Sequence, residues 1–175
     1  MSQRLLAVLS SPIGTISGYG AHSRDCFHSL YELYKNTWDF QLIATKWGSC
    51  PTNALDPNNE KDAIIIKHLL TAPLNRQPDI YIQITVPQEF NPIGKFNIGI
   101  NAGIESTLVP LDWIDGVNRM DLNIVPSKHS EMVFKGTKWE HVNNQTKLIE
   151  KVTQLEKPIK ILFEGVDTNI YKQIK

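Results

Sequence analysis

The sequence predicts an α/β fold, a single Rossmann-like three-layer domain with a mostly parallel sheet. Short apolar segments of strand length alternate along the chain with amphipathic segments of helix length, which is the pattern of a parallel sheet covered on both faces. The 175 residues are 41% hydrophobic and 21% charged, which suits one globular domain with a buried core. The chain shows no internal repeat and no low-complexity segment, so we expect one domain over 1–163.

The first half of the chain predicts strands and helices in alternation. A short apolar run at 4–9 predicts the first strand, and a loop rich in turn residues follows at 10–20. A helix is expected over 21–34, because apolar side chains recur there at i, i+3, i+4 and i+7, namely Phe27, Leu30, Tyr31 and Tyr34. The sequence then predicts a strand at 40–44, an irregular loop at 45–57, a helix at 60–70 and a strand at 80–86.

The second half continues the same alternation. Pro110 suits the first residue of a helix that runs through Val117, because its missing N–H is not needed there. Ser127 is expected to cap a helix over 128–135, which Gly136 ends. Strands are expected at 96–100, 122–125 and 159–163.

The segment 137–157 has two readings from sequence. It predicts either a polar hairpin around Asn143 and Asn144 or a short helix at 148–155. Because it is longer than a minimal connection, we expect it to contact another domain or a partner.

Charge and cysteine content narrow the class of function. Lys plus Arg and Asp plus Glu each number 18, so no net charge draws the chain to nucleic acid or to an anionic membrane. The apolar runs are short and the N-terminus lacks a signal-peptide pattern, which predicts a cytoplasmic protein without a transmembrane segment. Cys26 and Cys50 are expected to be reduced thiols, and His22 with Cys26 lacks a third ligand, so no metal site is expected.

A glycine-containing segment is the first feature that bears on chemistry. Gly18-Tyr19-Gly20-Ala21-His22-Ser23 looks like a dinucleotide fingerprint with serine in place of the third glycine. Eight residues separate Gly18 from the first strand, and Asp39 opens the second strand instead of ending it, so a dinucleotide-dependent oxidoreductase is disfavoured. Glycine and a helix N-terminus still favour a ligand that carries phosphate.

Four loops leave the carboxyl ends of predicted parallel strands, where such sheets bind ligands. We expect these loops to form the wall of a cleft: 18–22, 47–53, 87–90 and 103–107. In the second of them, Trp47 has two readings: its ring stacks on a sugar, or it fixes the loop to the sheet.

Several segments together resemble one known family. Ser11-Pro12 followed by Ser17-Gly18-Tyr19-Gly20-x-His22-Ser23-Arg24 resembles the opening of family-4-like retaining glycosyltransferases of GT-B architecture. That group's Glu-Thr, Trp-Val, Asn-Arg-Ala-Asp and Val-Pro-Ser signatures are similar to Glu105-Ser106-Thr107, Trp113-Ile114, Asn118-Arg119-Met120-Asp121 and Val125-Pro126-Ser127. Glu164-Gly165-Val166-Asp167-Thr168 with Tyr171 resembles the segment that closes the first half of such enzymes. These segments together span most of the chain, and their order and spacing resemble those of the family.

The resemblance implies transfer of a hexose from a nucleotide-sugar donor to a hydroxyl of a glycan or other acceptor. The nucleotide sugar is then a co-substrate, and neither a cofactor nor a protein-held metal is expected. The resemblance implies that His22 and Glu105 contact sugar or acceptor hydroxyls as catalytic residues. The implied donor-phosphate and substrate-binding residues are Gly18, Tyr19, Gly20 and Thr107, and Trp47 joins them if its ring stacks on a sugar. Asn118, Arg119 and Asp121 have two readings, a structural hydrogen-bond network among them or contacts with a ligand, and they are not counted as catalytic residues.

The chain also departs from the family pattern. The donor-binding half of such enzymes carries two glutamates seven residues apart and basic residues that hold the diphosphate, and nothing after Tyr171 supplies them. We therefore expect 164–175 to begin an interdomain linker, a C-terminal donor-binding domain or partner chain to supply the rest, and this chain alone to transfer little or no sugar. A non-catalytic glycan- or partner-binding module of the same fold remains the alternative.

Overall fold

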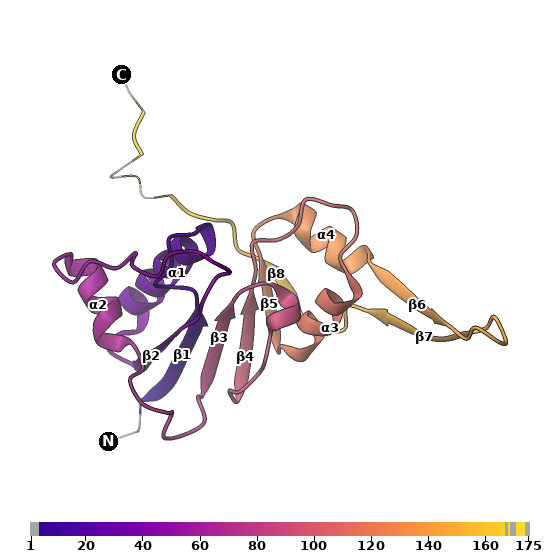
Figure 1. Ribbon diagram of the computed structural model, residues 1–175, viewed down its shortest axis with the longest axis horizontal. Helices are drawn as coiled ribbons and strands as arrows, with labels where there is room; N and C mark the ends of the chain where they lie inside the picture. The colour runs from indigo at the N-terminus through magenta and orange to yellow at the C-terminus, as the bar shows by residue number, and fades with distance from the viewer. Residues whose placement is uncertain (1–3, 167, 169–170, 174–175) are drawn as a thin grey trace.

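Six strands form one all-parallel sheet in the computed structural model, which describes residues 4–166, 168 and 171–173 (Figure 1). The strands of this sheet are β1 (Leu5–Ser11), β2 (Trp38–Ala44), β3 (Ile80–Ile84), β4 (Phe96–Ile100), β5 (Leu122–Val125) and β8 (Ile159–Ile161). Their order across the sheet is β2-β1-β3-β4-β5-β8. The predicted α/β fold with a Rossmann-like sheet is thereby confirmed.

Four helices and two further strands complete the described chain. The helices are α1 (Gly18–Tyr34), α2 (Glu60–His68), α3 (Leu111–Arg119) and α4 (Lys128–Gly136), with a short 3-10 helix, η1 (Pro87–Glu89). The strands β6 (Lys138–Val142) and β7 (Ile149–Gln154) form a separate antiparallel hairpin. Figure 1 shows α1 and α2 at the β2 end of the sheet, α3 and α4 at the other end, and the hairpin projecting beyond them.

The helices cover opposite faces of the sheet. Ala7 and Leu9 of β1 pack in one core with Phe27 of α1 and Ile65 of α2. A second core joins Val125 and Ile159 to side chains of α3 and α4: Ile114, Val117, Val133 and Phe134. Since Ile124 belongs to the first core and its neighbour Val125 to the second, the alternation of side chains places the two cores on the two faces.

Element boundaries differ from the predictions where neighbours intervene. The first helix begins at Gly18 and not at 21, because the side chain of Ser17 caps it by accepting from the Gly20 N–H. The second ends at His68, because the chain turns extended at Leu69 and forms a bridge with Leu42 of the edge strand β2. Gly136 is the last residue of α4, and Thr137 follows with a negative φ.

The last strand of the sheet and the segment 137–157 also differ in part from the predictions. The last strand stops at Ile161, because its partner strand β5 ends opposite it at Val125. Leu162 and Phe163 are therefore exposed. None of the described residues after β8 lies in a helix or strand, and Asp167 of the predicted linker motif lies outside the described residues. Of the two readings of 137–157, the hairpin is correct and the helix at 148–155 is wrong.

Asn118, Arg119 and Asp121 each make structural hydrogen bonds, and the partners are other residues of the domain. Asn118 donates from Nδ2 to the Gln154 carbonyl and accepts from the Glu156 N–H. Arg119 donates to the backbone carbonyls of Phe90 and Gln88, which fixes the segment that contains η1. Asp121 accepts from the backbone and side-chain nitrogens of Asn97, and these hydrogen bonds hold its pKa below the usual range. In the part of the chain that the structure describes, no helix is long and apolar enough to cross a membrane.

Candidate functional site

The strand order defines where a ligand-binding crevice is expected. The chain leaves β1 toward α1 and β2 on one side, and it leaves β3 toward β4 on the other. Loops that diverge in this way open a crevice at the carboxyl ends of the two strands. Ser11 ends β1 and Ile84 ends β3, so the crevice lies above the β1–β3 pair. Three of the predicted cleft loops, 47–53, 87–90 and 103–107, follow carboxyl ends of this sheet, whereas 18–22 is the first turn of α1 and the loop after β1 is 12–17.

Tyr19 joins these loops to one another. Its ring stacks on Trp47 from the loop after β2, with ring centroids 4.2 Å apart. Its hydroxyl accepts a hydrogen bond of 3.1 Å from the N–H of Ala102, just after β4. Burial raises the pKa of the Tyr19 phenol, and the carboxylates of Glu89 and Glu164 add to this rise. Parts of the chain that follow β1, β2 and β4 therefore meet at one aromatic ring.

The contact with Tyr19 bears on the second predicted role of Trp47, which was to fix its loop to the sheet. The ring is half-buried and fixes its own loop to the first turn of α1 through Tyr19. A stacked aromatic pair presents an apolar surface with a polar rim, which suits the C–H face of a sugar ring. Contact with a sugar stays a prediction for Trp47.

Glu89 is a site residue that the sequence reasoning did not single out. Its carboxylate accepts a hydrogen bond of 2.5 Å from the Thr85 hydroxyl, while its carbonyl accepts from the Gln83 side chain. These contacts orient an exposed carboxylate at the carboxyl end of β3, within electrostatic reach of Tyr19. The signal was present in the sequence, because Glu89 is the only ionisable residue of the predicted cleft loop 87–90.

His22 lies one turn after Tyr19 on α1, between a thiol and a carboxylate. Its Nε2 is 3.6 Å from the Cys26 sulfur, and its Nδ1 is 3.8 Å from a Glu164 carboxylate oxygen. Thiol, imidazole and carboxylate in this order resemble an activated nucleophile in kind. Burial, however, raises the pKa of the Cys26 thiol to about 12, so the sulfur stays protonated at neutral pH. The group therefore suits hydrogen bonding to hydroxyls better than attack by sulfur.

Two buried polar atoms near the crevice have no partner among the described residues. They are the hydroxyl of Ser11 at the end of β1 and the side-chain nitrogen of Asn101 just after β4. Both residues are almost fully buried, at 1% exposure each. Asn101 uses its side-chain oxygen to accept from the Gly103 N–H, which shapes the start of the 103–107 loop. Unused hydrogen-bonding capacity of this kind is uncommon in folded proteins and is concentrated where function requires it.

The glycines of the first turn of α1 have separate structural roles. A Cβ at Gly20 would lie 2.3 Å from the Thr15 carbonyl oxygen, so only glycine allows the helix to approach the preceding loop. Gly18 has open space around it. Since the Gly20 N–H is already bonded to Ser17, fewer donors remain for a phosphate than the sequence suggested. Binding of donor phosphates by 18–20 stays a prediction.

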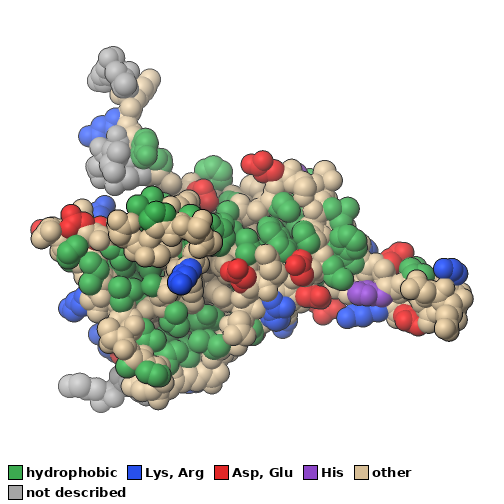
Figure 2. Space-filling view, viewed as in Figure 1, with side chains coloured by type: hydrophobic (Ala, Val, Ile, Leu, Met, Phe, Trp, Pro, Cys, Tyr) green, Lys and Arg blue, Asp and Glu red, His purple; other side chains and the backbone are tan. Residues whose placement is uncertain are grey.

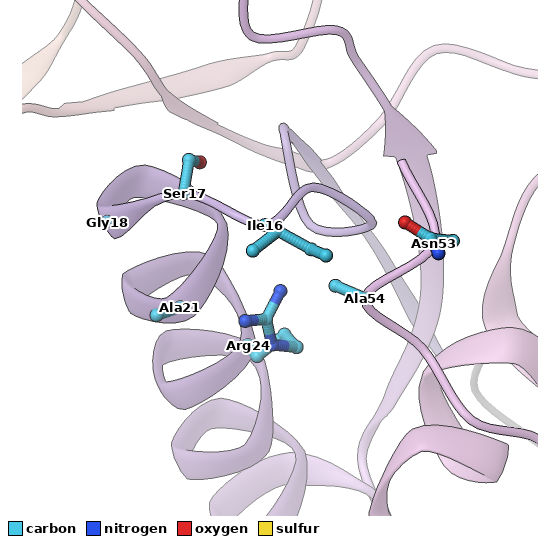
Figure 3. Close-up of a pocket in the computed structure, with 7 residues that line it drawn as sticks. All are labelled: Ile16, Ser17, Gly18, Ala21, Arg24, Asn53 and Ala54. Carbon is cyan, nitrogen blue, oxygen red and sulfur yellow. The ribbon is translucent and has the colours of Figure 1, made fainter. Parts of the chain in front are cut away.

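A hollow of about 580 Å³ lies beside this turn, on the side of α1 that carries Ala21 and Arg24 (Figure 3). The guanidinium group of Arg24 points into the space between α1 and the 53–54 segment. One of its nitrogens donates to the carbonyls of Ile13 and Thr15, so the side chain ties the loop after β1 to the helix. We place the candidate site at the Tyr19 crevice, because there the loops of several strands converge.

Glu105 and Thr107, the remaining predicted site residues, make no side-chain hydrogen bond or ion pair with Tyr19 among the described residues. Glu105 and Thr107 are exposed in the loop between β4 and α3. The neighbouring Ser106 carbonyl accepts from His129 of α4, which draws this loop toward α4. The catalytic role of Glu105 and the substrate role of Thr107 stay predictions. Within residues 4–166, 168 and 171–173, no three His, Cys, Asp or Glu side chains gather as metal ligands would.

The site combines a stacked aromatic pair, an oriented carboxylate, an imidazole and unused amide and hydroxyl groups. Carboxylates accept hydrogen bonds from hydroxyls, whereas imidazole can donate or accept, so the set matches a polyol. Comparison with known proteins finds no matching family model, no matching curated sequence and no matching solved structure.

Proposed function

We propose that this chain is the acceptor-side domain of a hexosyltransferase that uses a nucleotide-sugar donor. The observation that carries the proposal is the meeting at Tyr19 of residues that follow three parallel strands: Tyr19 itself follows β1, Trp47 stacks on it from the loop after β2, and the Ala102 N–H after β4 donates to its hydroxyl. The segments that resemble glycosyltransferases of GT-B architecture contribute much of this crevice, since 17–24 includes both Tyr19 and His22.

In this proposal each side chain has a defined part. The ring of Trp47 packs on the C–H face of an acceptor sugar, while Glu89 accepts a hydrogen bond from an acceptor hydroxyl. His22 binds a second hydroxyl and is itself held by Glu164. We assign the donor nucleotide to a C-terminal domain or partner chain, where the resemblance places the two glutamates and the basic residues that stabilise a leaving diphosphate.

The first test is binding of neutral oligosaccharides and glycosides by this chain, screened on a glycan array and measured by titration calorimetry. Trp47→Ala is expected to weaken binding of a captured glycan by about tenfold, which corresponds to about 1.4 kcal/mol of lost stacking. Trp38→Ala is the matched control, because Trp38 also stacks on a tyrosine of α1, Tyr34, but does so at the amino end of β2, away from the crevice. Equal affinity of the Trp47 variant and wild type would contradict the site.

A transfer assay separates an enzyme from a binding module. A panel of nucleotide sugars is incubated with the captured glycan and this chain, with and without the product of the neighbouring reading frame. Transfer that requires both proteins and falls in Glu89→Gln supports the proposal. Glycan binding without transfer under either condition would instead favour a non-catalytic module of the same fold.

A further inference from the structure

The β6–β7 hairpin has a face that nothing in the described chain covers. Its base is anchored, because Trp139 donates from its indole to the Val109 carbonyl and Asn118 donates to the Gln154 carbonyl. Beyond this base, Figure 1 shows the two strands projecting away from the six-stranded sheet and from the segment that follows β8. β6 and β7 pair only with each other among the described residues, so the outer edge of β7 is free.

A bulge gathers three apolar side chains on one face of the hairpin. His141 pairs with Lys151 and Val142 pairs with Ile149, so Glu150 is an extra residue in β7. Because of this shift, Ile149 and Val152 lie on the same face, together with Val142 and with Glu140, which pairs with Val152. These three side chains are 54%, 42% and 46% exposed, respectively.

The opposite face of the hairpin carries Trp139, His141, Lys151 and Thr153. His141 shares a hydrogen bond of 2.9 Å with the Thr153 hydroxyl on this face. An isolated two-stranded hairpin is marginally stable in water, and additional strands beside it stabilise it. The unpaired edge of β7 is therefore where a further strand is expected.

The sequence of β7 indicates which partner fits. Ile149-Glu150-Lys151-Val152 reads apolar, acidic, basic, apolar. When two such strands run antiparallel about a two-fold axis between Glu150 and Lys151, each Glu150 lies opposite the partner subunit's Lys151. Each Ile149 then lies opposite the partner subunit's Val152, so the two apolar faces join into one.

We propose that the hairpin is a homodimer interface, in which β7 of one copy lies antiparallel beside β7 of a second copy. A self-complementary arrangement of charge and shape is what a two-fold interface requires. Glu150 accepts a hydrogen bond from Asn143 through one carboxylate oxygen, which leaves the other oxygen to accept from the lysine of the second copy. The chain carries no net charge, so two copies approach without repulsion.

The charges of the hairpin argue against an anionic membrane as the partner. The hairpin contains Lys138, Lys147 and Lys151 but also Glu140 and Glu150. Figure 2 shows acidic and basic side chains together on the projecting hairpin. Membrane-binding segments of this kind carry clustered lysines and arginines without acids between them.

The test is the molar mass of the chain measured by sedimentation equilibrium over a range of concentrations. Wild type is expected to show a monomer–dimer equilibrium. Glu150→Lys and Lys151→Glu each place like charges opposite one another at two symmetric positions, and each is expected to weaken dimerisation by about tenfold. The double variant Glu150→Lys with Lys151→Glu exchanges the charges and is expected to restore the dimer.

Matched controls separate the interface from folding. Glu140→Lys and Lys138→Glu change charge by the same amount on β6, away from the two-fold axis, and are expected to leave dimerisation unchanged. Circular dichroism melting confirms that each variant is folded.

Three results would overturn the proposal. The first is a monomeric wild type at every concentration, and the second is a double variant that dimerises no better than the single ones. The third is a monomer in solution that co-sediments with vesicles of phosphatidylserine, which would assign the apolar face to lipid.

Discussion

Gly116 offers a sharp test of how the crevice is held together. It lies buried in the middle of α3, where α3 packs against η1, the 3-10 helix that ends in Glu89. A Cβ at this position would lie 1.9 Å from the Pro87 carbonyl oxygen and 2.4 Å from the carbonyl carbon. Both atoms are backbone, so no side-chain rotation relieves the clash. We predict that Gly116→Ala destabilises the fold and displaces Glu89.

The magnitude follows from two opposed effects. Alanine in place of a helical glycine stabilises a helix by about 1 kcal/mol. To reach an ordinary contact of 3.4 Å, however, the Pro87 carbonyl must retreat by about 1.5 Å. It is held there by the hydrogen bond from the Phe90 N–H and by Arg119, which binds the Gln88 and Phe90 carbonyls. Overpacking of this kind costs about 3 kcal/mol, so the net loss is about 2 kcal/mol, or about 4–8 °C in Tm.

The assay is urea unfolding followed by circular dichroism, with Gly136→Ala as the matched control. Gly136 is also helical, and a Cβ there would have nothing within 4 Å, so its replacement by alanine is expected to be neutral or to stabilise by up to about 1 kcal/mol. Glycan affinity should fall in Gly116→Ala and stay unchanged in Gly136→Ala. A Gly116→Ala protein as stable as wild type would refute the account of the α3–η1 contact.

Two further predictions concern titratable groups. The Asp79 carboxylate accepts from Lys95, from the Leu6 N–H and from Arg76, which holds its pKa well below its usual range. Its stabilising contribution is therefore present above the unfolded pKa of about 3.9 and is lost as pH falls, so the urea midpoint should drop more steeply from about pH 4 to pH 2 in wild type than in Asp79→Asn. Since burial raises the pKa of the Cys26 thiol to about 12, iodoacetamide at about pH 8 should alkylate Cys26 slowly in the native chain and rapidly in urea, as peptide mass spectrometry would show. Equal rates in the two conditions would contradict the burial of this thiol.

The sequence specified the elements because local rules govern them. The apolar stripe of Phe27, Leu30 and Tyr31 predicted the first helix, and the strands 96–100 and 122–125 were placed at their observed bounds. Ser127 was predicted as a helix cap, and its hydroxyl accepts from the Ser130 N–H. Short-range periodicity and capping chemistry are properties of a few neighbouring residues, so they can be read without a structure.

Local rules could not predict the ends of elements that are set by contact with a strand far away in the sequence. The last strand ends at Ile161 only because β5 ends at Val125, and the second helix ends early because Leu69 bridges to Leu42. The hairpin at 138–154 could not be separated from a helix by local pattern, because its register contains a bulge that shifts the alternation of side chains.

The candidate site, like the fold, was predicted in part from the sequence and decided in part by the tertiary structure. The sequence by itself determined an α/β domain and which loops follow the carboxyl ends of its strands. Only the tertiary structure decided which side chains of those loops meet: it joined Tyr19 to Trp47 and Ala102, oriented Glu89 through Thr85, and left Glu105 exposed in a loop drawn toward α4. The physical reason is that strand order, β2-β1-β3-β4-β5-β8, sets which loops are neighbours, and strand order depends on packing between segments far apart in the chain.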